Sequence, residues 1–121
     1  MSDVTFYDIN GSPVAYTEDG EHIYLFDGTP VAYFYNQLIY SYTGNHLGYF
    51  EDGWIRDNNG DCVFFTDNTT GGPYKPYKQY KPYKGYKQYR PYKEYREMAS
   101  YRGYKSSSWS DLSSVLFFGI S

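Results

Sequence analysis

Four copies of one short motif limit the possible fold of this chain more than any other feature. The motif recurs as FYDINGSPVAY (6–16), IYLFDGTPVAY (23–33), IYSYTGNHLGY (39–49) and IRDNNGDCVFF (55–65). The glycines that mark the copies are 17, 16 and 16 residues apart. Each glycine follows Asn, Asp or Thr and has β-branched and aromatic flanks, which is the pattern of a β-hairpin. Asn10-Gly11, Asp27-Gly28 and Asn59-Gly60 predict type I′ turns, in which both central residues have positive φ.

A second set of turn signals lies between the copies, at Asp19-Gly20, Asn36-Gln37 and Asp52-Gly53. Residues 6–65 therefore predict eight short strands in an up-and-down meander. A unit of about sixteen residues cannot bury an apolar face alone, so we expect the four hairpins to close around a pseudo-fourfold axis. Closure also removes exposed strand edges. The predicted fold class is all-β.

The alternation of side chains along a strand predicts which face of the sheet is buried. We expect the first, ninth and eleventh positions of the copies to form the core. These positions are Phe6/Ile23/Ile39/Ile55, Val14/Val31/Leu47/Val63 and Tyr16/Tyr33/Tyr49/Phe65. The second and tenth positions face the other way, and the tenth holds Ala15, Ala32, Gly48 and Phe64. The second position is a candidate ligand or partner surface. It holds Tyr7, Tyr24, Tyr40 and Arg56.

A tyrosine–lysine run, GGPYKPYKQYKPYKGYKQYRPYKEYREMASYRGYK, occupies residues 71–105. Tyrosine recurs every third residue and a basic residue follows it, with one triplet replaced by Met98-Ala99-Ser100. Prolines block an α-helix up to Pro91, whereas polyproline II has three residues per turn and keeps such a period in register. We expect an irregular, polyproline-II-like segment with a tyrosine edge, a basic edge and a small or polar edge. After Pro91 the sequence is compatible with a helix.

The charge of the chain is divided between two regions. Residues 1–73 contain eleven acidic residues and one basic residue, Arg56, for a net charge of −10. Residues 74–105 contain ten basic residues against Glu94 and Glu97, for a net charge of +8. Opposite charges attract, within one molecule or between molecules. The run is then a strap around the acidic domain that buries its tyrosines, an exposed arm, or an element exchanged between molecules.

The run adds further candidate contact residues to the proposed surface. They are Tyr77, Lys78, Tyr80, Lys81, Tyr83 and Lys84. The predicted organisation is a four-hairpin domain (1–70), the triplet segment packed on it (71–105) and a tail (106–121). In the tail, Trp109, Leu112, Val115, Leu116 and Phe118 have near-helical spacing. We expect a short helix, capped by Ser108 or Ser110, that covers one mouth of the domain.

The four copies, the GGP at 71–73, the triplet run and SWSDLS at 108–113 together resemble the 4-fold β-flower proteins over essentially the whole chain. The resemblance implies four hairpin petals around an axis, which form a shallow basket with an apolar interior. It implies no assigned activity, and a loose likeness of that family to tubby-type lipid-binding domains suggests lipid as a ligand. This chain differs in carrying tyrosine at the first triplet position, where relatives commonly carry aliphatic residues.

The sequence gives little support for catalysis. Its histidines are His22 and His46, its one cysteine is Cys62, and the aspartates coincide with hairpin turns. We expect no catalytic site, no metal and no cofactor, and we favour a non-enzymatic binding or scaffold role. The alternatives are a lipid or other apolar ligand in the basket, single-stranded nucleic acid or another polyanion on the run, and self-association. No membrane-spanning stretch and no secretory signal are visible, so we expect a cytoplasmic location.

Overall fold

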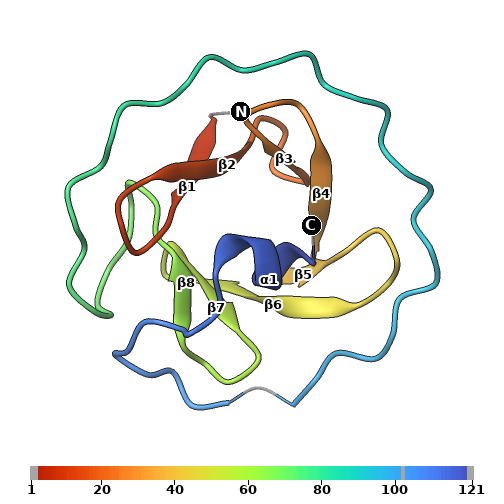
Figure 1. Ribbon diagram of the computed structural model, residues 1–121. Helices are drawn as coiled ribbons and strands as arrows, with labels where there is room; N and C mark the ends of the chain where they lie inside the picture. Colours follow the sequence, from red (N-terminus) through yellow and green to blue (C-terminus); the bar gives the residue numbers. More distant parts are fainter. Residues whose placement is uncertain (1–2, 102, 120–121) are drawn as a thin grey trace.

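The computed structural model describes residues 3–101 and 103–119, in which eight antiparallel strands form one sheet in the order of the chain (Figure 1). The strands are β1 (Val4–Tyr7), β2 (Pro13–Thr17), β3 (His22–Leu25), β4 (Pro30–Tyr35), β5 (Leu38–Tyr40), β6 (His46–Glu51), β7 (Trp54–Asp57) and β8 (Cys62–Phe64). A β-bridge between Tyr7 and Phe65, just beyond β8, joins the two ends of the sheet. The predicted all-β fold of four hairpins around a common centre is confirmed.

The hairpin tips belong to a different turn class from the predicted type I′. At the first tip the Gly11 N–H donates to the Asp8 carbonyl oxygen (2.9 Å), and the Asp8 N–H donates to the Ser12 carbonyl oxygen (3.0 Å). Positive φ at this tip is confined to Gly11. The tip is therefore a type I turn followed by a left-handed glycine. The same pair of hydrogen bonds closes residues 25–29, 41–45 and 57–61.

Two turns between the hairpins have the geometry that was expected at the tips. Asn36 and Gln37 both have positive φ, and so do Asp52 and Gly53. Each pair links two strands directly, β4 to β5 and β6 to β7. These are two-residue hairpin loops with both central residues in the left-handed region, as in a type I′ turn.

A bulge in each hairpin changes which side chains face inward. Phe6 pairs with Ala15, but the next residue, Tyr7, pairs with Pro13, so Val14 is the extra residue. An extra residue shifts the alternation by one position. Ala15 therefore lies on the inner face with Phe6, and Tyr16 lies on the outer face.

The predicted core is therefore correct for two of its three rings and wrong for the third. The prediction for the tenth position is also wrong, because Ala15, Ala32 and Phe64 lie in the inner cluster. The first and ninth positions belong to the inner cluster, in which Phe6, Ile23, Ile39 and Ile55 are fully buried. The eleventh position faces outward, where its members pair with the second position of the neighbouring hairpin. The observed pairs are Tyr16 with Tyr24, Tyr33 with Tyr40, Tyr49 with Arg56, and Phe65 with Tyr7.

A short helix, α1 (Ser114–Phe118), covers part of the inner face (Figure 1). Phe118 stacks on Phe64 and Phe117 meets it edge-on, with centroid distances of 5.4 and 5.7 Å. The helix begins later than predicted because Ser113, rather than Ser108 or Ser110, accepts the capping hydrogen bond from Leu116 N–H. In the described residues, no helix has the length and apolar character needed to cross a bilayer.

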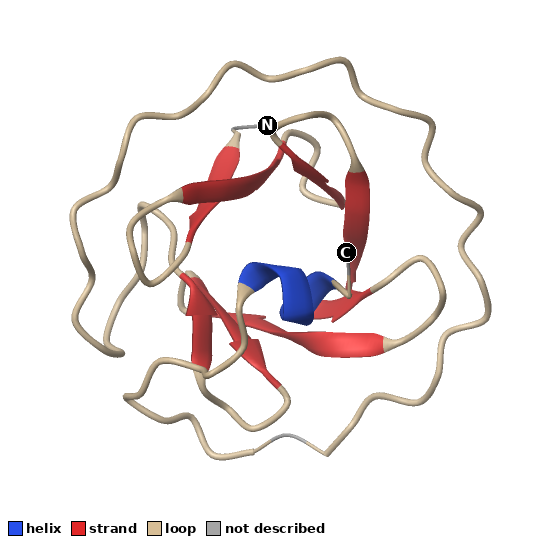
Figure 2. Ribbon diagram, in the orientation of Figure 1, coloured by secondary structure: helices blue, strands red, loops and turns tan. Residues whose placement is uncertain are grey.

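The triplet segment, called the strap from here on (residues 71–105), runs around the outside of the hairpin ring (Figure 2). Its described residues contain neither helix nor strand, so the possible helix after Pro91 does not form. The two ends of the strap meet near β8 (Figure 1). Of the alternatives that the sequence left open, the structure has the strap and not the free arm.

Candidate functional site

The strap is held to the hairpin tips by one hydrogen bond that recurs every nine residues. The N–H groups of Gln79, Gln88 and Glu97 donate to the carbonyl oxygens of tip glycines Gly11, Gly28 and Gly44, each at 2.9 Å. Ser106, the residue after the strap, makes the same bond to Gly60 at 3.2 Å. Three triplets thus correspond to one hairpin, and they span about 28 Å in polyproline II.

The tip glycines leave room for the strap backbone as well as closing the turns. A Cβ atom on Gly28 would lie 1.7 Å from the Tyr86 carbonyl oxygen, and one on Gly11 would lie 1.8 Å from that of Tyr77. Cβ atoms on Gly44 and Gly60 would lie 2.1 and 1.8 Å from the carbonyl oxygens of Tyr95 and Tyr104. The four glycines that define the sequence repeat are therefore also the four docking points of the strap.

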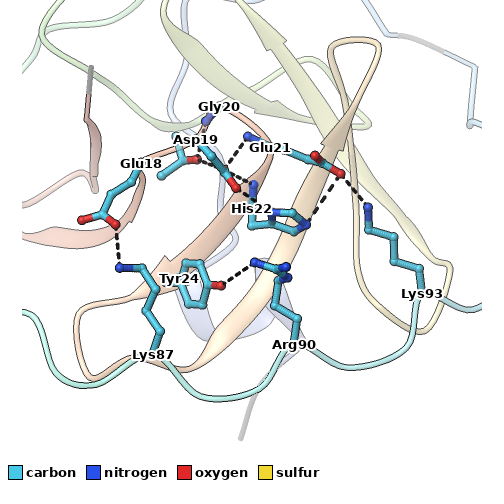
Figure 3. A network of polar contacts seen from close by, with 10 residues as sticks. Glu18, Asp19, Gly20, Glu21, His22, Tyr24, Lys87, Arg90 and Lys93 are labelled. Atoms are coloured by element: carbon cyan, nitrogen blue, oxygen red, sulfur yellow. Dashed lines mark hydrogen bonds and ion pairs between the residues drawn. The ribbon is translucent and has the colours of Figure 1, made fainter. Parts of the chain in front are cut away.

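The basic edge of the strap faces the acidic turns of the hairpin domain. Around the turn between β2 and β3, Glu18 pairs with Lys87 at 2.5 Å and Glu21 pairs with Lys93 at 2.6 Å (Figure 3). Lys84 reaches both Glu18 (2.8 Å) and Asp3 (2.7 Å). The same edge contacts Asp67 through Lys78 and Asp52 through Lys105.

These ion pairs shift the pKa values of both partners. Hydrogen bonds from Lys84 and Lys87 hold the pKa of Glu18 below its ordinary value, and Lys93 does the same for Glu21. In return, bonds to Asp3 and Glu18 raise the pKa of Lys84. The ion pairs therefore favour the charged forms of both the carboxylates and the lysine.

The cations also lie over aromatic rings on the outer face of the sheet. The Lys84 ammonium is 4.4 Å from the centroid of the Tyr16 ring, and the Lys93 ammonium is 4.5 Å from that of Tyr33. Arg90 donates to the Tyr24 hydroxyl at 3.3 Å (Figure 3). Cations at this distance from an aromatic face are attracted to it. The strap therefore closes over the aromatic outer face.

The tyrosine edge of the strap points away from the protein, contrary to the expectation that the strap buries its tyrosines. All ten strap tyrosines are exposed, with relative accessibilities of 86–101%. Met98, which stands at a tyrosine position of the triplet series, is equally exposed at 92%. The basic edge faces inward because the acidic groups lie there, and this leaves the tyrosine edge to solvent.

The candidate residues from the sequence fall into three groups. Tyr77, Tyr80 and Tyr83 lie on the exposed edge. Lys78 and Lys84 are engaged with acidic residues of the domain, and Lys81 is exposed. The second-position residues are instead buried under the strap, so they do not share a surface with the exposed tyrosines. They are Tyr7, Tyr24, Tyr40 and Arg56.

Arg56 and Trp109 fasten the two ends of the strap. The buried Arg56 guanidinium donates to the carbonyl oxygens of Gly60 (2.6 Å) and Ser106 (2.8 Å). The Trp109 indole packs against Trp54 and donates its N–H to the Tyr74 carbonyl oxygen at 3.0 Å. The start and the end of the strap are thereby joined to each other and to the domain.

The third hairpin holds the strap in a different way, through His46. The Ser100 N–H donates to His46 Nδ1 at 3.1 Å, and the His46 N–H donates to Glu97 Oε2 at 2.7 Å. Burial lowers the pKa of His46, against the opposing effects of a hydrogen bond with Gly48 and the charge of Glu97. At this hairpin the strap carries Ala99. The equivalent residues at the two preceding hairpins, nine and eighteen positions earlier, are Arg90 and Lys81. The break in the triplet pattern therefore coincides with the buried imidazole.

The inner face leaves a small open cavity of about 200 Å³ beside the core. It is lined mainly by Val4, Phe6, Phe34 and Phe50, with Thr17 and Gln37 at its polar side. The ring centroids of Phe34 and Phe50 are 5.4 Å apart. In the described ranges, 3–101 and 103–119, no group of three or more His, Cys, Asp or Glu side chains is placed to hold a metal ion.

Sequence reasoning missed the residues that attach the strap, although a signal for them was present. The polar third-position residues Gln79, Gln88 and Glu97 recur at nine residues, and the tip glycines recur at 16 or 17. Four hairpins and three triplets per hairpin match the length of the run. That correspondence predicts one strap contact per hairpin.

Comparison with known proteins agrees with this architecture. No curated protein and no solved structure shows significant similarity to the chain. The family model described as 4-fold beta flower protein matches residues 4–118, which include the four hairpins, the strap and α1. The chain belongs to the 4-fold β-flower family.

Proposed function

We propose that this protein is a non-enzymatic binding or scaffold protein whose binding surface is the tyrosine edge of the strap. One observation carries the proposal: ten exposed tyrosines lie on a segment whose backbone and cations are fixed to a folded domain. A tyrosine side chain offers about 150–250 Å² for burial, whereas the largest apolar patch of a typical monomer covers about 300–600 Å². The edge offers several times that area.

The attachment of the strap to the domain makes its exposed tyrosines better suited to binding a partner than those of a flexible arm. A flexible tyrosine-rich arm loses backbone entropy on binding, whereas this backbone is already ordered by its bonds to the hairpin tips. Tyrosine itself has few rotatable bonds, so it contributes contact area at a low entropic cost. The edge is therefore a pre-organised aromatic surface.

Binding of a nucleic acid or other polyanion has less support. Lys78, Lys84, Lys87, Lys93 and Lys105 pair with carboxylates of the domain. A polyanion has to compete with these carboxylates, in a chain of net charge −3. Tyrosine stacking alone lacks the positive groove that single-strand binders combine with it.

A small apolar ligand in the basket is a second candidate, which the phenylalanine-lined cavity favours. Its volume of about 200 Å³ is below the range of about 300–1,000 Å³ that is usual for ligand pockets. Helix α1 fills another part of the inner face with Phe117 and Phe118. A lipid chain therefore has less room here than a small molecule.

Iodination of the tyrosines tests the proposed surface. The purified protein is iodinated in buffer, in albumin solution and in extract of the cells that make it, and each tyrosine is quantified by peptide mass spectrometry. We expect the ten strap tyrosines to react in buffer and albumin, and a contiguous group of them to be protected in the extract. Tyr16 and Tyr33 stay unreactive throughout because they are buried. Equal reactivity of all ten in every solution contradicts the proposal.

A further inference from the structure

The spacing of the strap tyrosines suits one kind of partner surface. Ideal polyproline II, the conformation that the triplet period favours, advances about 3.1 Å per residue, so its tyrosines three residues apart would be about 9 Å apart along the edge. Aromatic rings in contact have centroids about 4.5–7 Å apart. A ring inserted midway between two successive tyrosines therefore lies about 4.6 Å from each of them, at the close end of that range. Each gap on the edge accepts one further aromatic ring.

Successive gaps are filled only by a surface with the same spacing. The series runs without interruption from Tyr74 to Tyr95 and is broken by Met98. An aromatic row with that period is present on every other copy of this chain. Two such edges have the spacing to interdigitate, with tyrosines of one in gaps of the other.

The charges of the strap do not oppose this contact. Its cations turn inward and pair with carboxylates of their own domain, as Lys84 does with Asp3 and Glu18. The neutral phenols of two copies therefore meet without bringing like charges together. A strongly charged partner has to displace those internal pairs, and a second copy does not.

From these observations, and resting on the proposed function, we infer that the tyrosine edge binds the tyrosine edge of a second copy of this chain. The strap is convex (Figures 1 and 2), so only a short run of tyrosines of each copy interdigitates at one contact. The rest of the edge stays free for further copies. Association is therefore weak at each contact and continues beyond the dimer as concentration rises.

Sedimentation velocity of the purified full-length protein over a wide concentration range tests the inference. The test variant replaces every second tyrosine by serine, at Tyr77, Tyr83, Tyr89, Tyr95 and Tyr104, which widens the gaps from three residues to six or more. The matched control carries phenylalanine at the same five positions. A second control, V115S/L116S, removes the exposed apolar residues of α1. Thermal unfolding verifies that every variant is folded.

We expect the average mass of the wild type, the phenylalanine variant and the α1 variant to rise with concentration. The serine variant requires at least about tenfold higher concentration for the same mass, since it loses several aromatic contacts per molecule. A wild type that stays monomeric, or a serine variant that associates like the wild type, overturns the inference. A monomeric wild type whose tyrosines are protected in cell extract leaves the proposed function standing with a different partner.

Discussion

The eighteen tyrosines of this protein form two sets with opposite surroundings. In the hairpin domain seven of eight are buried, and Tyr35 is 43% exposed. In the strap all ten are exposed. The first set stacks between neighbouring hairpins, as Tyr16 does on Tyr24, and is covered by strap lysines. The comparison shows that the position of the strap cations decides the role of a tyrosine. Domain tyrosines are buried because strap cations cover their rings, whereas strap tyrosines are exposed because their neighbouring cations turn toward the domain.

The largest expected difference between the two sets is in stability. Tyr16→Ala removes a fully buried ring and is expected to lower the free energy of unfolding by about 3–5 kcal/mol. Tyr80→Ala removes a fully exposed ring and is expected to change it by less than about 0.5 kcal/mol. Urea denaturation measures both. Similar losses in the two variants contradict the division.

The second prediction distinguishes two contributions of a tip glycine to stability, the packing of the strap against it and the turn conformation that it adopts. Gly28→Ala places a methyl group against the Tyr86 carbonyl at a residue with φ of +98°, whereas Gly71→Ala also puts a side chain at positive φ, +68°, but with nothing within 4 Å. We expect about 1–2 kcal/mol of destabilisation for Gly71→Ala. Gly28→Ala adds about 1 kcal/mol for each strap hydrogen bond that it breaks, at Gln88 and Gly85. If the two variants have equal unfolding free energies, the strap does not pack on this tip.

The third prediction concerns the pH dependence of stability that results from the burial of His46 where it binds the strap. The folded state lowers the pKa of His46 below its ordinary value of about 6.5, so folding favours the neutral ring. The corresponding stabilisation is complete above pH 6.5 and is lost as the pH falls through the lowered pKa. His46→Asn keeps an acceptor for Ser100 N–H but does not titrate there, while Glu97, Tyr40 and Tyr49 remain around it.

Unfolding free energies of the wild type and His46→Asn, measured between pH 8 and 4.5, test this prediction. We expect the wild type to lose more stability than the variant as the pH falls through this window. Below it, protonation of Glu18 and Glu21 destabilises both proteins alike, since their pKa values are also lowered. Parallel curves across the window show that His46 does not couple the strap to pH.

The smallest expected effect is that of a single ion pair. Lys84→Met keeps most of the side-chain volume but loses the pairs to Asp3 and Glu18 and the charge over Tyr16. These groups are partly exposed, so we expect a loss of no more than about 1 kcal/mol, and less in high salt. Lys81→Met is the control, since Lys81 makes no ion pair with any residue in 3–101 or 103–119. Equal behaviour of the two variants at low salt contradicts a specific role for Lys84.

The sequence predicted the hairpins and offered the strap as one of three alternatives, because short periods of turn residues and of tyrosine, lysine and proline can be read directly from the chain. The spacing of the tip glycines predicted the four hairpins. The opposite charges of the two regions predicted that residues 74–105 are attracted to the domain. The direction of the tyrosine edge was not predictable from a period of three alone. That period defines three edges but does not say which of them faces the acidic turns.

The pairing register explains the remaining errors on the outer face. The prediction kept the first, ninth and eleventh positions on one face through the turn. Phe6 instead pairs with Ala15, so Tyr16 and its equivalents lie on the opposite face from Phe6. The second-position residue Tyr7 was placed on the outer face, as the structure has it, but its cover by the strap depends on contacts far apart in the sequence.

Amide hydrogen exchange along the strap tests the central claim most directly, which is that the strap is attached at every hairpin tip with its tyrosines outward. We predict slow exchange at Gln79, Gln88 and Glu97, which donate to the tip glycines. We predict fast exchange at Tyr80, Tyr83 and Tyr89 between them. Uniformly fast exchange from residue 74 to residue 105 would contradict the account.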